Sequence, residues 1–269
     1  MMRIHRIFAI AAVLAPLSAA GYPGGTPSYQ TDIAPFCAGC HSSKIPEVLL
    51  GAGERAEKEV SERKHIAVIL AGEKGYASLT EADRQTLAEQ IRALDVASSV
   101  SMAAPESVAP GASFEVSVSV TGGAGPVVGV GLVDSAHRWY ARPVASAGWR
   151  VAAPPQVVGP DGQPQVDWLA KRPENLDRNL SFVNVSGIAS DSSTQQWSSA
   201  RVTFTLKAPD TPGSYPLVAV YLYGTEKSSV LGYTTNAVGW KEVRGGVSGG
   251  SGRVVFTPVK QITVAAPAE

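Results

Sequence analysis

Ser113-Phe-Glu-Val-Ser-Val-Ser-Val-Thr121 is the stretch that decides the fold of most of this 269-residue chain. Apolar side chains at Phe114, Val116, Val118 and Val120 alternate with polar ones. Because successive side chains of a strand point to opposite faces, this period of two predicts a β-strand with one buried face. The stretch therefore predicts a sheet that covers an apolar core.

Similar short segments continue to the end of the chain, separated by turns rich in Gly and Pro, such as 159–162. Many short strands joined by such turns are typical of an antiparallel β-sandwich. The run Ala208-Pro-x-x-Pro-Gly-x-Tyr215 resembles immunoglobulin-like domains, in which a tyrosine near a strand start often bonds back across a corner. Residues 112–269 are therefore predicted to form an immunoglobulin-like sandwich. Further strands are predicted at 127–133, 181–185, 200–206, 216–223, 253–256 and 261–264.

Two helices are predicted before these strands, over 55–71 and 80–94. Thr80 suits the N-cap of the second helix, and acidic residues follow in its first turn. Its apolar residues recur at i, i+4 and i+7 from Leu87 to Leu94, the spacing of one helix face. The change of period between helices and strands predicts two domains. The segment 98–111 is rich in small residues with two prolines and is predicted to link them.

The segment Cys37-Ala-Gly-Cys40-His41 carries the clearest chemical motif. Two cysteines three positions apart, followed at once by histidine, are the pattern of covalent c-type haem attachment. Both thiols can form thioethers with one porphyrin, and His41 is then placed to bind the iron. A zinc site needs about four ligands, and the chain has only two cysteines. A thioredoxin-like dithiol would lie near a βαβ pattern, which is not found in this sequence.

Residues 28–97 resemble a small class I monohaem cytochrome c domain. The resemblance implies an all-α domain with one covalent haem c, bound by Cys37 and Cys40 with His41 as the proximal ligand. The whole chain is then an α+β two-domain protein, with the cytochrome domain before the sandwich. The residues that carry the resemblance are Asp32-Ile-Ala-Pro35, Cys37-x-x-Cys40-His41, His65-Ile66-x-x-Ile69-x-x-Gly72 and Leu79-Thr80-x-x-Asp83-x-x-x-Leu87-x-x-x-Ile91.

One departure from that family concerns the sixth iron ligand. Similar domains place a methionine before the last helix, but the loop 73–78 has none. His65 and Ile69 share one helix face. Ile69 and Tyr76 are both expected to lie at the haem. His65 or Met102, the latter just beyond the last helix, is therefore the expected sixth ligand, and the alternative is an iron left open or water-bound. Weaker candidates are Tyr76, Lys74 and His137.

The first twenty residues read as an export signal. Arg3 and Arg6 precede an uncharged apolar run over 7–17, and small residues follow up to a predicted cleavage site after Ala20. The run is too short for an ordinary membrane span, and no later stretch is apolar enough for one. Without residues 1–20 the chain has 21 basic and 23 acidic residues, a net charge of −2, because the removed part holds two of the 23 bases. This balance gives no reason to expect nucleic-acid binding.

Together these features predict a periplasmic or secreted monohaem cytochrome that passes single electrons, with the sandwich docking it to a redox protein partner. Two alternatives stay open: a haem-based sensor or ligand-binding protein, and a scaffold or binding module of a larger redox complex. No catalytic motif of a hydrolase, zinc protease or nucleotide-binding enzyme occurs. An electron carrier is therefore expected rather than an enzyme in its own right.

Overall fold

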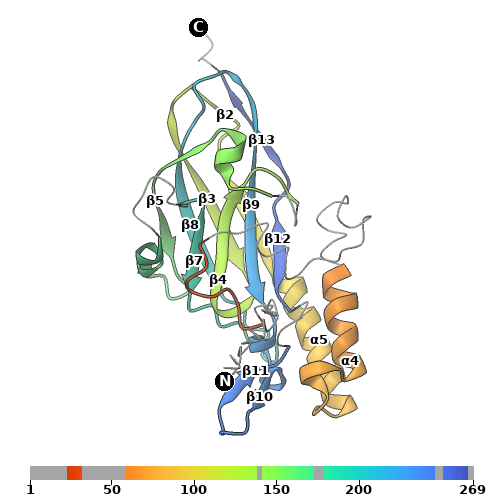
Figure 1. Cartoon of the computed structure of the whole chain (residues 1–269). Helices are drawn as coiled ribbons and strands as arrows, with labels where there is room; N and C mark the ends of the chain where they lie inside the picture. The colour runs from red at the N-terminus through yellow and green to blue at the C-terminus, as the bar shows by residue number, and fades with distance from the viewer. Residues whose placement is uncertain (1–22, 32–58, 138–140, 173–178, 246–250, 266–269) are drawn as a thin grey trace, which may run out of the picture.

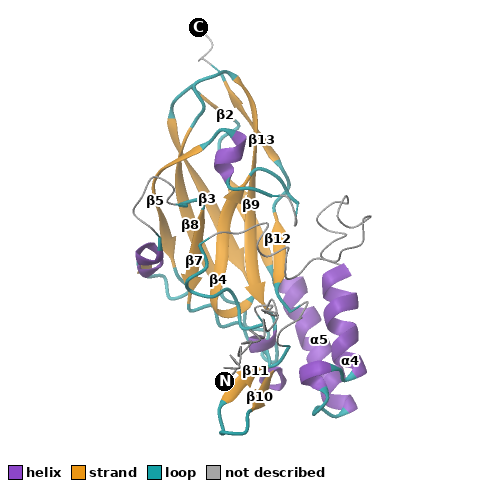
Figure 2. Ribbon diagram, in the orientation of Figure 1, coloured by secondary structure: helices purple, strands orange, loops and turns teal. Residues whose placement is uncertain are grey.

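Two β-sheets stacked face to face form most of the molecule, and a pair of helices lies beside their lower end in Figure 1. The computed structural model describes residues 23–31, 59–137, 141–172, 179–245 and 251–265. The arrangement of helices, strands and loops is shown in Figure 2.

The first sheet has the strand order β1-β3-β8-β5-β6. Its centre is the pairing of β3 with β8, in which Val118 lies opposite Val202 and both side chains are buried. The alternation of 113–121 places the valines of β3 against the other sheet, as the sequence predicts. The strands are β1 (Ser99–Ala103), β3 (Ser113–Thr121), β8 (Ser199–Lys207), β5 (Arg150–Val158) and β6 (Pro164–Gln165).

The second sheet has the order β2-β13-β9-β4-β7, with β12 also paired to β9. The long strand β9 organises it: its first half pairs with β13, its second half with β12, and β4 lies on its other side. The strands are β2 (Ser107–Val108), β13 (Lys260–Val264), β9 (Gly213–Gly224), β4 (Ala124–Val133), β7 (Phe182–Ser186) and β12 (Arg253–Phe256).

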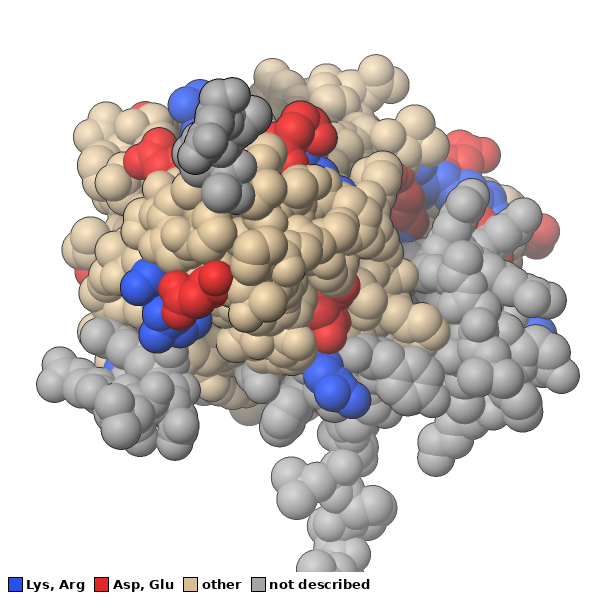
Figure 3. Space-filling view, turned by 90° about the horizontal axis from the view of Figure 1, so that it is seen from above, with Lys and Arg blue, Asp and Glu red and all other residues tan. Residues whose placement is uncertain are grey.

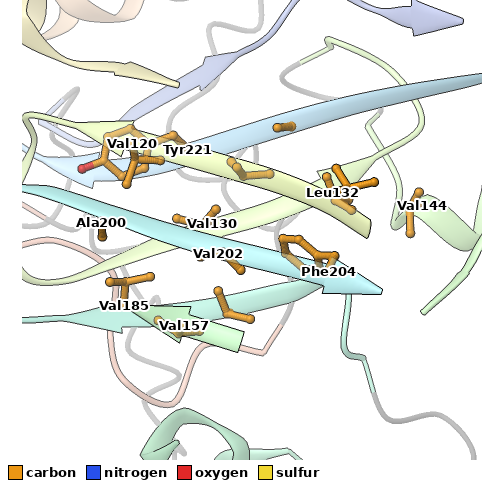
Figure 4. Close-up of a cluster of buried hydrophobic side chains, with 14 of the residues drawn as sticks. Val120, Val130, Leu132, Val144, Val157, Val185, Ala200, Val202, Phe204 and Tyr221 are labelled. Carbon is orange, nitrogen blue, oxygen red and sulfur yellow. The ribbon is translucent and has the colours of Figure 1, made fainter. Parts of the chain in front are cut away.

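The main core lies between the two sheets, where side chains such as Val120, Val202 and Phe204 of the first sheet meet Val130 and Tyr221 of the second (Figure 4). All five are at most 1% exposed. Burying a large apolar side chain contributes about 1.5–3 kcal/mol each. This core therefore stabilises the sandwich.

The corner at the start of β9 has the predicted tyrosine bond. The Tyr215 hydroxyl donates to the carbonyl of Thr211 at 2.8 Å. Its ring packs edge-on against Trp149, at 5.6 Å between centroids, and the indole N–H of Trp149 donates to the carbonyl of Pro216. A polar contact and an aromatic pair thus fix the same corner.

The helical part begins with η1 (Glu59–Ile66) and α4 (Ala67–Ala71), passes through η2 (Lys74–Tyr76), and ends with α5 (Glu81–Ala97). The Thr80 side chain caps α5 by accepting a hydrogen bond from the amide of Asp83. Apolar residues of these helices form a small core of their own. Leu94 is the exception, because it belongs to the core of the sandwich.

A short β-hairpin, β10 (Tyr233–Thr235) and β11 (Lys241–Val243), extends below the sandwich in Figure 1. The remaining elements are single 3₁₀ turns at the ends of strands. They are η3 (Val144–Ala147), η4 (Asp167–Lys171), η5 (Glu226–Ser228) and η6 (Val230–Gly232).

The predicted α+β fold with a separate all-α cytochrome c domain over 28–97 is wrong. Of that region, 59–97 forms helices that pack on the sandwich, and 28–31 runs along the sandwich as part of a longer segment. The helix patterns that carried the resemblance describe amphipathic helices in general, and here Ile66, Ile69, Leu87 and Ile91 pack against one another in a small helical core. The identification as a class I-like cytochrome c is therefore not retained. The segment 98–111, predicted as a linker, contains β1 and β2, one strand in each sheet.

Candidate functional site

The predicted haem-attachment residues, Cys37, Cys40 and His41, lie outside the described residues. Their assignment rests on the sequence motif alone and stays a prediction. The described residues do show how the chain is held on both sides of this motif.

Residues 23–31, here called the N-terminal strap, are fixed to the edge of the second sheet. The amide of Thr26 donates to the carbonyl of Val127 at 2.7 Å, and the Asn184 side chain donates to the carbonyl of Pro27. Asn179 likewise binds the carbonyl of Thr31 at 3.0 Å. Side-chain amides thus satisfy strap carbonyls that no strand covers.

Arg172 is the central residue of this attachment and is only 3% exposed. Its Nη1 donates to the carbonyl of Gln30 at 2.8 Å, and its Nη2 donates to the carbonyl of Phe182. The guanidinium lies 5.7 Å from the ring centre of Trp168 and 5.3 Å from that of Phe182. The planar fork and the aromatic contacts suit arginine and not lysine.

On the other side of the motif, His65 at the end of η1 is buried, with 1% of its surface exposed. Its Nε2 lies 2.6 Å from Oε1 of Glu226 and 3.1 Å from the hydroxyl of Tyr76. Its Nδ1 lies 3.1 Å from Nη2 of Arg253. Both ring nitrogens therefore have protein partners, from η5, η2 and β12.

These contacts define the proton positions on His65. Arginine can only donate hydrogen bonds, so Nδ1 of His65 must accept from Arg253. The ring proton then sits on Nε2 and is donated to Glu226. In this geometry the ring of His65 accepts at Nδ1 and donates at Nε2.

Glu226 is the most completely buried acid of the cluster, with no exposed surface. One carboxylate oxygen accepts from His65 and from the Tyr76 hydroxyl, both at 2.6 Å, and the other accepts from Thr225 at 2.8 Å. Burial alone would raise the pKa of Glu226, but His65 and these hydrogen bonds hold the pKa below its ordinary value. Burial, and then the Glu226 charge, raise the pKa of Tyr76 far above its ordinary value.

Arg253 and Arg244 add contacts between helices and sandwich. Arg253 pairs with both carboxylate oxygens of Asp95 on α5, and Tyr223 donates to the same carboxylate. Burial disfavours the charged form of Arg253, but Asp95 outweighs it and raises the pKa. Arg244 donates to the carbonyl of Gly75 and the hydroxyl of Ser78.

Together these residues form what we call the polar seam, a layer between the small helical core and the sandwich core. Its members are buried or partly buried, and they come from segments up to 188 residues apart. Buried charges are tolerated in proteins only when they are paired or hydrogen-bonded, as they are here. The seam consists of His65, Tyr76 and Asp95 on the helical side and Tyr223, Glu226, Arg244 and Arg253 on the sandwich side.

The other predicted haem-side residues are not brought together with one another. Ile69 is fully buried in the helical core, and Met102 lies on β1 opposite Val118, partly buried against the sandwich core. Lys74 is exposed, with a left-handed backbone (φ 53°), and His137 follows β4. Which residue, if any, is the sixth ligand stays a prediction.

A metal site does not appear within the described ranges, where no three His, Cys, Asp or Glu side chains cluster in a way that could hold an ion. A mainly apolar groove of about 380 Å³ lies at the outer edge of the first sheet, lined by residues of β5, β6 and η4 that include Trp168. On the face seen in Figure 3, acidic and basic residues occur in small mixed groups. In the parts of the chain that the structure describes, no helix is long and apolar enough to cross a membrane.

Comparison with known proteins gives little help with identity. No protein family matches the sequence, and no curated protein matches it either. Among solved structures, the PapD-like domain 7 of human CEP192 is 14% identical, over 47% of this chain and 71% of that one, with a TM-score of 0.16. A TM-score this low supports no argument about fold or function.

The sandwich side of the seam is not predicted from the sequence. Glu226 and Arg253 look like ordinary charged residues next to strands, and no local pattern marks them as buried. Only the pairing of β12 with β9 and the packing of η1 bring them to His65.

Proposed function

We propose that this protein is an exported one-electron carrier with one haem bound covalently to Cys37 and Cys40, and with His41 as the iron ligand. The observation that carries the proposal is the Cys-x-x-Cys-His motif, which is specific to this attachment. When bound, the haem supplies an iron that cycles between Fe(II) and Fe(III). The proposal includes neither a cytochrome c fold nor nucleic-acid binding.

The attached segments on both sides of the motif support a role for the sandwich. The strap ends at Thr31 on Asn179 and Arg172, and the chain returns at η1, where His65 meets Glu226. The described segments before and after the motif thus both contact the β-sandwich. We therefore propose that the sandwich holds the haem segment and docks it to a redox protein partner.

We also propose that residues 1–20 direct export and are removed after Ala20. The basic start, the apolar run and the small residues before position 21 support this assignment. The haem motif agrees with export, because c-type haem is attached to proteins outside the cytoplasm.

A second candidate is a haem protein that binds a small ligand at iron. The contacts of His65 favour this candidate, because to bind iron the side chain would have to give up its contact with Glu226 or with Arg253. An iron with His41 as its single protein ligand would leave one position open for a diatomic gas.

The test is production of the full chain in a bacterium that attaches c-type haem. We expect haem that resists acid–acetone extraction and a mature chain that begins at Gly21. The double variant Cys37→Ser, Cys40→Ser should lose the haem, and His137→Ala should keep it. Free haem released from the wild type would refute the attachment.

Carbon monoxide added to the reduced protein separates the two candidates. A low-spin iron that does not bind carbon monoxide supports electron transfer, and rapid binding supports the ligand-binding function. If His65→Ala converts a low-spin iron to high-spin, His65 is the sixth ligand and its contacts in the seam rearrange on haem binding.

A further inference from the structure

Most edges of the two sheets are blocked against further strands. A free edge exposes a row of N–H and C=O groups, and proteins commonly block it with prolines, very short strands or covering groups. The β6 edge of the first sheet has two residues and begins with Pro164. At the β7 edge of the second sheet, the side chains of Arg172 and Gln165 bind backbone groups of Phe182 and Ser186. The strand β2 has two residues, and the first half of β12 is buried.

The strand β1 has none of these protections. It is the last strand of the first sheet, and it pairs with β3 along its whole length. The segment Ser99–Ala103 contains no charged residue and no proline, and the side chains of its first, third and fifth residues are exposed. Among the residues that the structure describes, only β3 gives hydrogen-bond partners to the backbone of β1. The outer edge of β1 is therefore open to another strand.

The sequence of β1 is complementary to a second copy of itself. Two such strands can pair antiparallel about a two-fold axis at Ser101. Val100 of one copy then lies opposite Met102 of the other. Likewise Ser99 lies opposite Ala103, and Ser101 lies opposite its own copy. The pairing joins the apolar side chains that face the sandwich core and the small ones on the exposed face, and no like charges meet.

We propose that the outer edge of β1 binds β1 of a second copy of this chain, with Ser101 at the two-fold axis, so that the two first sheets become one continuous sheet. The end of α5 supports this pairing. Val96, three residues before β1, is 89% exposed, and antiparallel pairing brings the partner's Ala103 to this end of β1. A pair of five-residue strands is small beside the roughly 1,200–2,000 Å² of a stable complex, so the dimer is weak and depends on concentration.

Sedimentation velocity of the mature full chain, from about 10 µM to 1 mM, covers the range of a weak contact. We expect the wild type to change from monomer to dimer as the concentration rises. Ser101→Lys should stay monomeric throughout, because two like charges would lie directly opposite each other. The matched control is Ser119→Lys: Ser119 is an exposed serine on β3, paired with Ser101 within the sheet, and this variant should dimerise like the wild type.

A mixing experiment locates the axis. Ser101→Lys and Ser101→Glu should each be monomeric, and an equimolar mixture of the two should form dimers, because opposite charges then face each other. A wild type that stays monomeric at the highest concentration overturns the proposal and leaves the edge to a strand of a different protein. A dimer that Ser101→Lys does not weaken, or a mixture that stays monomeric, overturns it as well.

Oxidative cross-linking covers the case in which the charged variants fail to fold. Residues directly opposite each other in an antiparallel pair have Cβ atoms about 4.5–5.5 Å apart, so Ser101→Cys should form a disulfide-linked dimer. Ser119→Cys lies one strand away from the edge and should not, and the wild type controls for its own two cysteines. Equal cross-linking of the two variants would contradict the pairing at Ser101.

Discussion

At the scale of single residues, Tyr215 offers the simplest test of the sandwich corner. Its hydroxyl donates to the Thr211 carbonyl, and its ring packs on Trp149. Tyr215→Phe removes the hydrogen bond and keeps the aromatic contact. We expect a loss of about 1 kcal/mol in the free energy of unfolding, measured by urea denaturation.

The control for this change is Tyr29→Phe. Tyr29 is 69% exposed, so removing its hydroxyl should leave the free energy of unfolding within about 0.5 kcal/mol of the wild type. Equal losses in the two variants would show that the corner bond does not stabilise the fold.

The same scale shows why some residues were predictable and others were not. The Tyr215 bond spans four residues, so its turn and its partner are both contained in the run 208–215. The partner of His65 is Glu226, 161 residues away. A helix face with a histidine predicts a buried contact, but its composition does not tell whether haem, a metal or a carboxylate lies opposite.

At the scale of elements, the turn between β3 and β4 carries the chain from one sheet to the other. Gly122 and Gly123 both have positive φ, 76° and 70°. A Cβ on Gly123 would lie 2.3 Å from the Tyr221 hydroxyl and 2.7 Å from Cβ of Tyr223. Glycine is therefore required here by conformation and by space.

We expect Gly123→Ala to lower the free energy of unfolding by about 2–4 kcal/mol, the sum of backbone strain and overpacking. Gly239→Ala is the control, because Gly239 also has positive φ (86°) but no atom within 4 Å of the added Cβ. That variant should lose about 1 kcal/mol. Thermal unfolding of both proteins measures the difference, and equal shifts would argue against the clash.

Elements with a strong period were predicted well. The predicted strand 113–121 matches β3, and the helix predicted to begin after Thr80 is α5, which runs on to Ala97. The strands β1 and β2 were missed, because 98–111 is dominated by small residues and prolines that are equally typical of a linker. The segment forms these two strands by pairing with β3 and β13.

At the scale of the whole molecule, the error was to treat a change of period as a domain boundary. The helices of 59–97 pack their apolar faces against one another. In addition, Leu94 of α5 packs in the core between the sheets, and Asp95 of α5 pairs with Arg253. The position of a side chain along a helix does not reveal that two successive turns face different cores. The haem motif stays a prediction, because Cys37, Cys40 and His41 lie outside the described residues.

The two cores make a prediction about cooperativity. Leu87 and Leu94 lie on the same helix, and both are fully buried, but Leu87 packs in the helical core and Leu94 in the sandwich core. Replacing either with Ala removes the same apolar volume, at a cost of about 2–5 kcal/mol.

Leu94→Ala should therefore lower the urea midpoints of helical circular dichroism and tryptophan fluorescence together. Leu87→Ala should lower the helical midpoint alone, because Trp149 and Trp168, which report on the sandwich, are buried away from the helical core. If Leu87→Ala shifts both midpoints equally, the helices and the sandwich unfold as one unit, and the polar seam transmits stability between them.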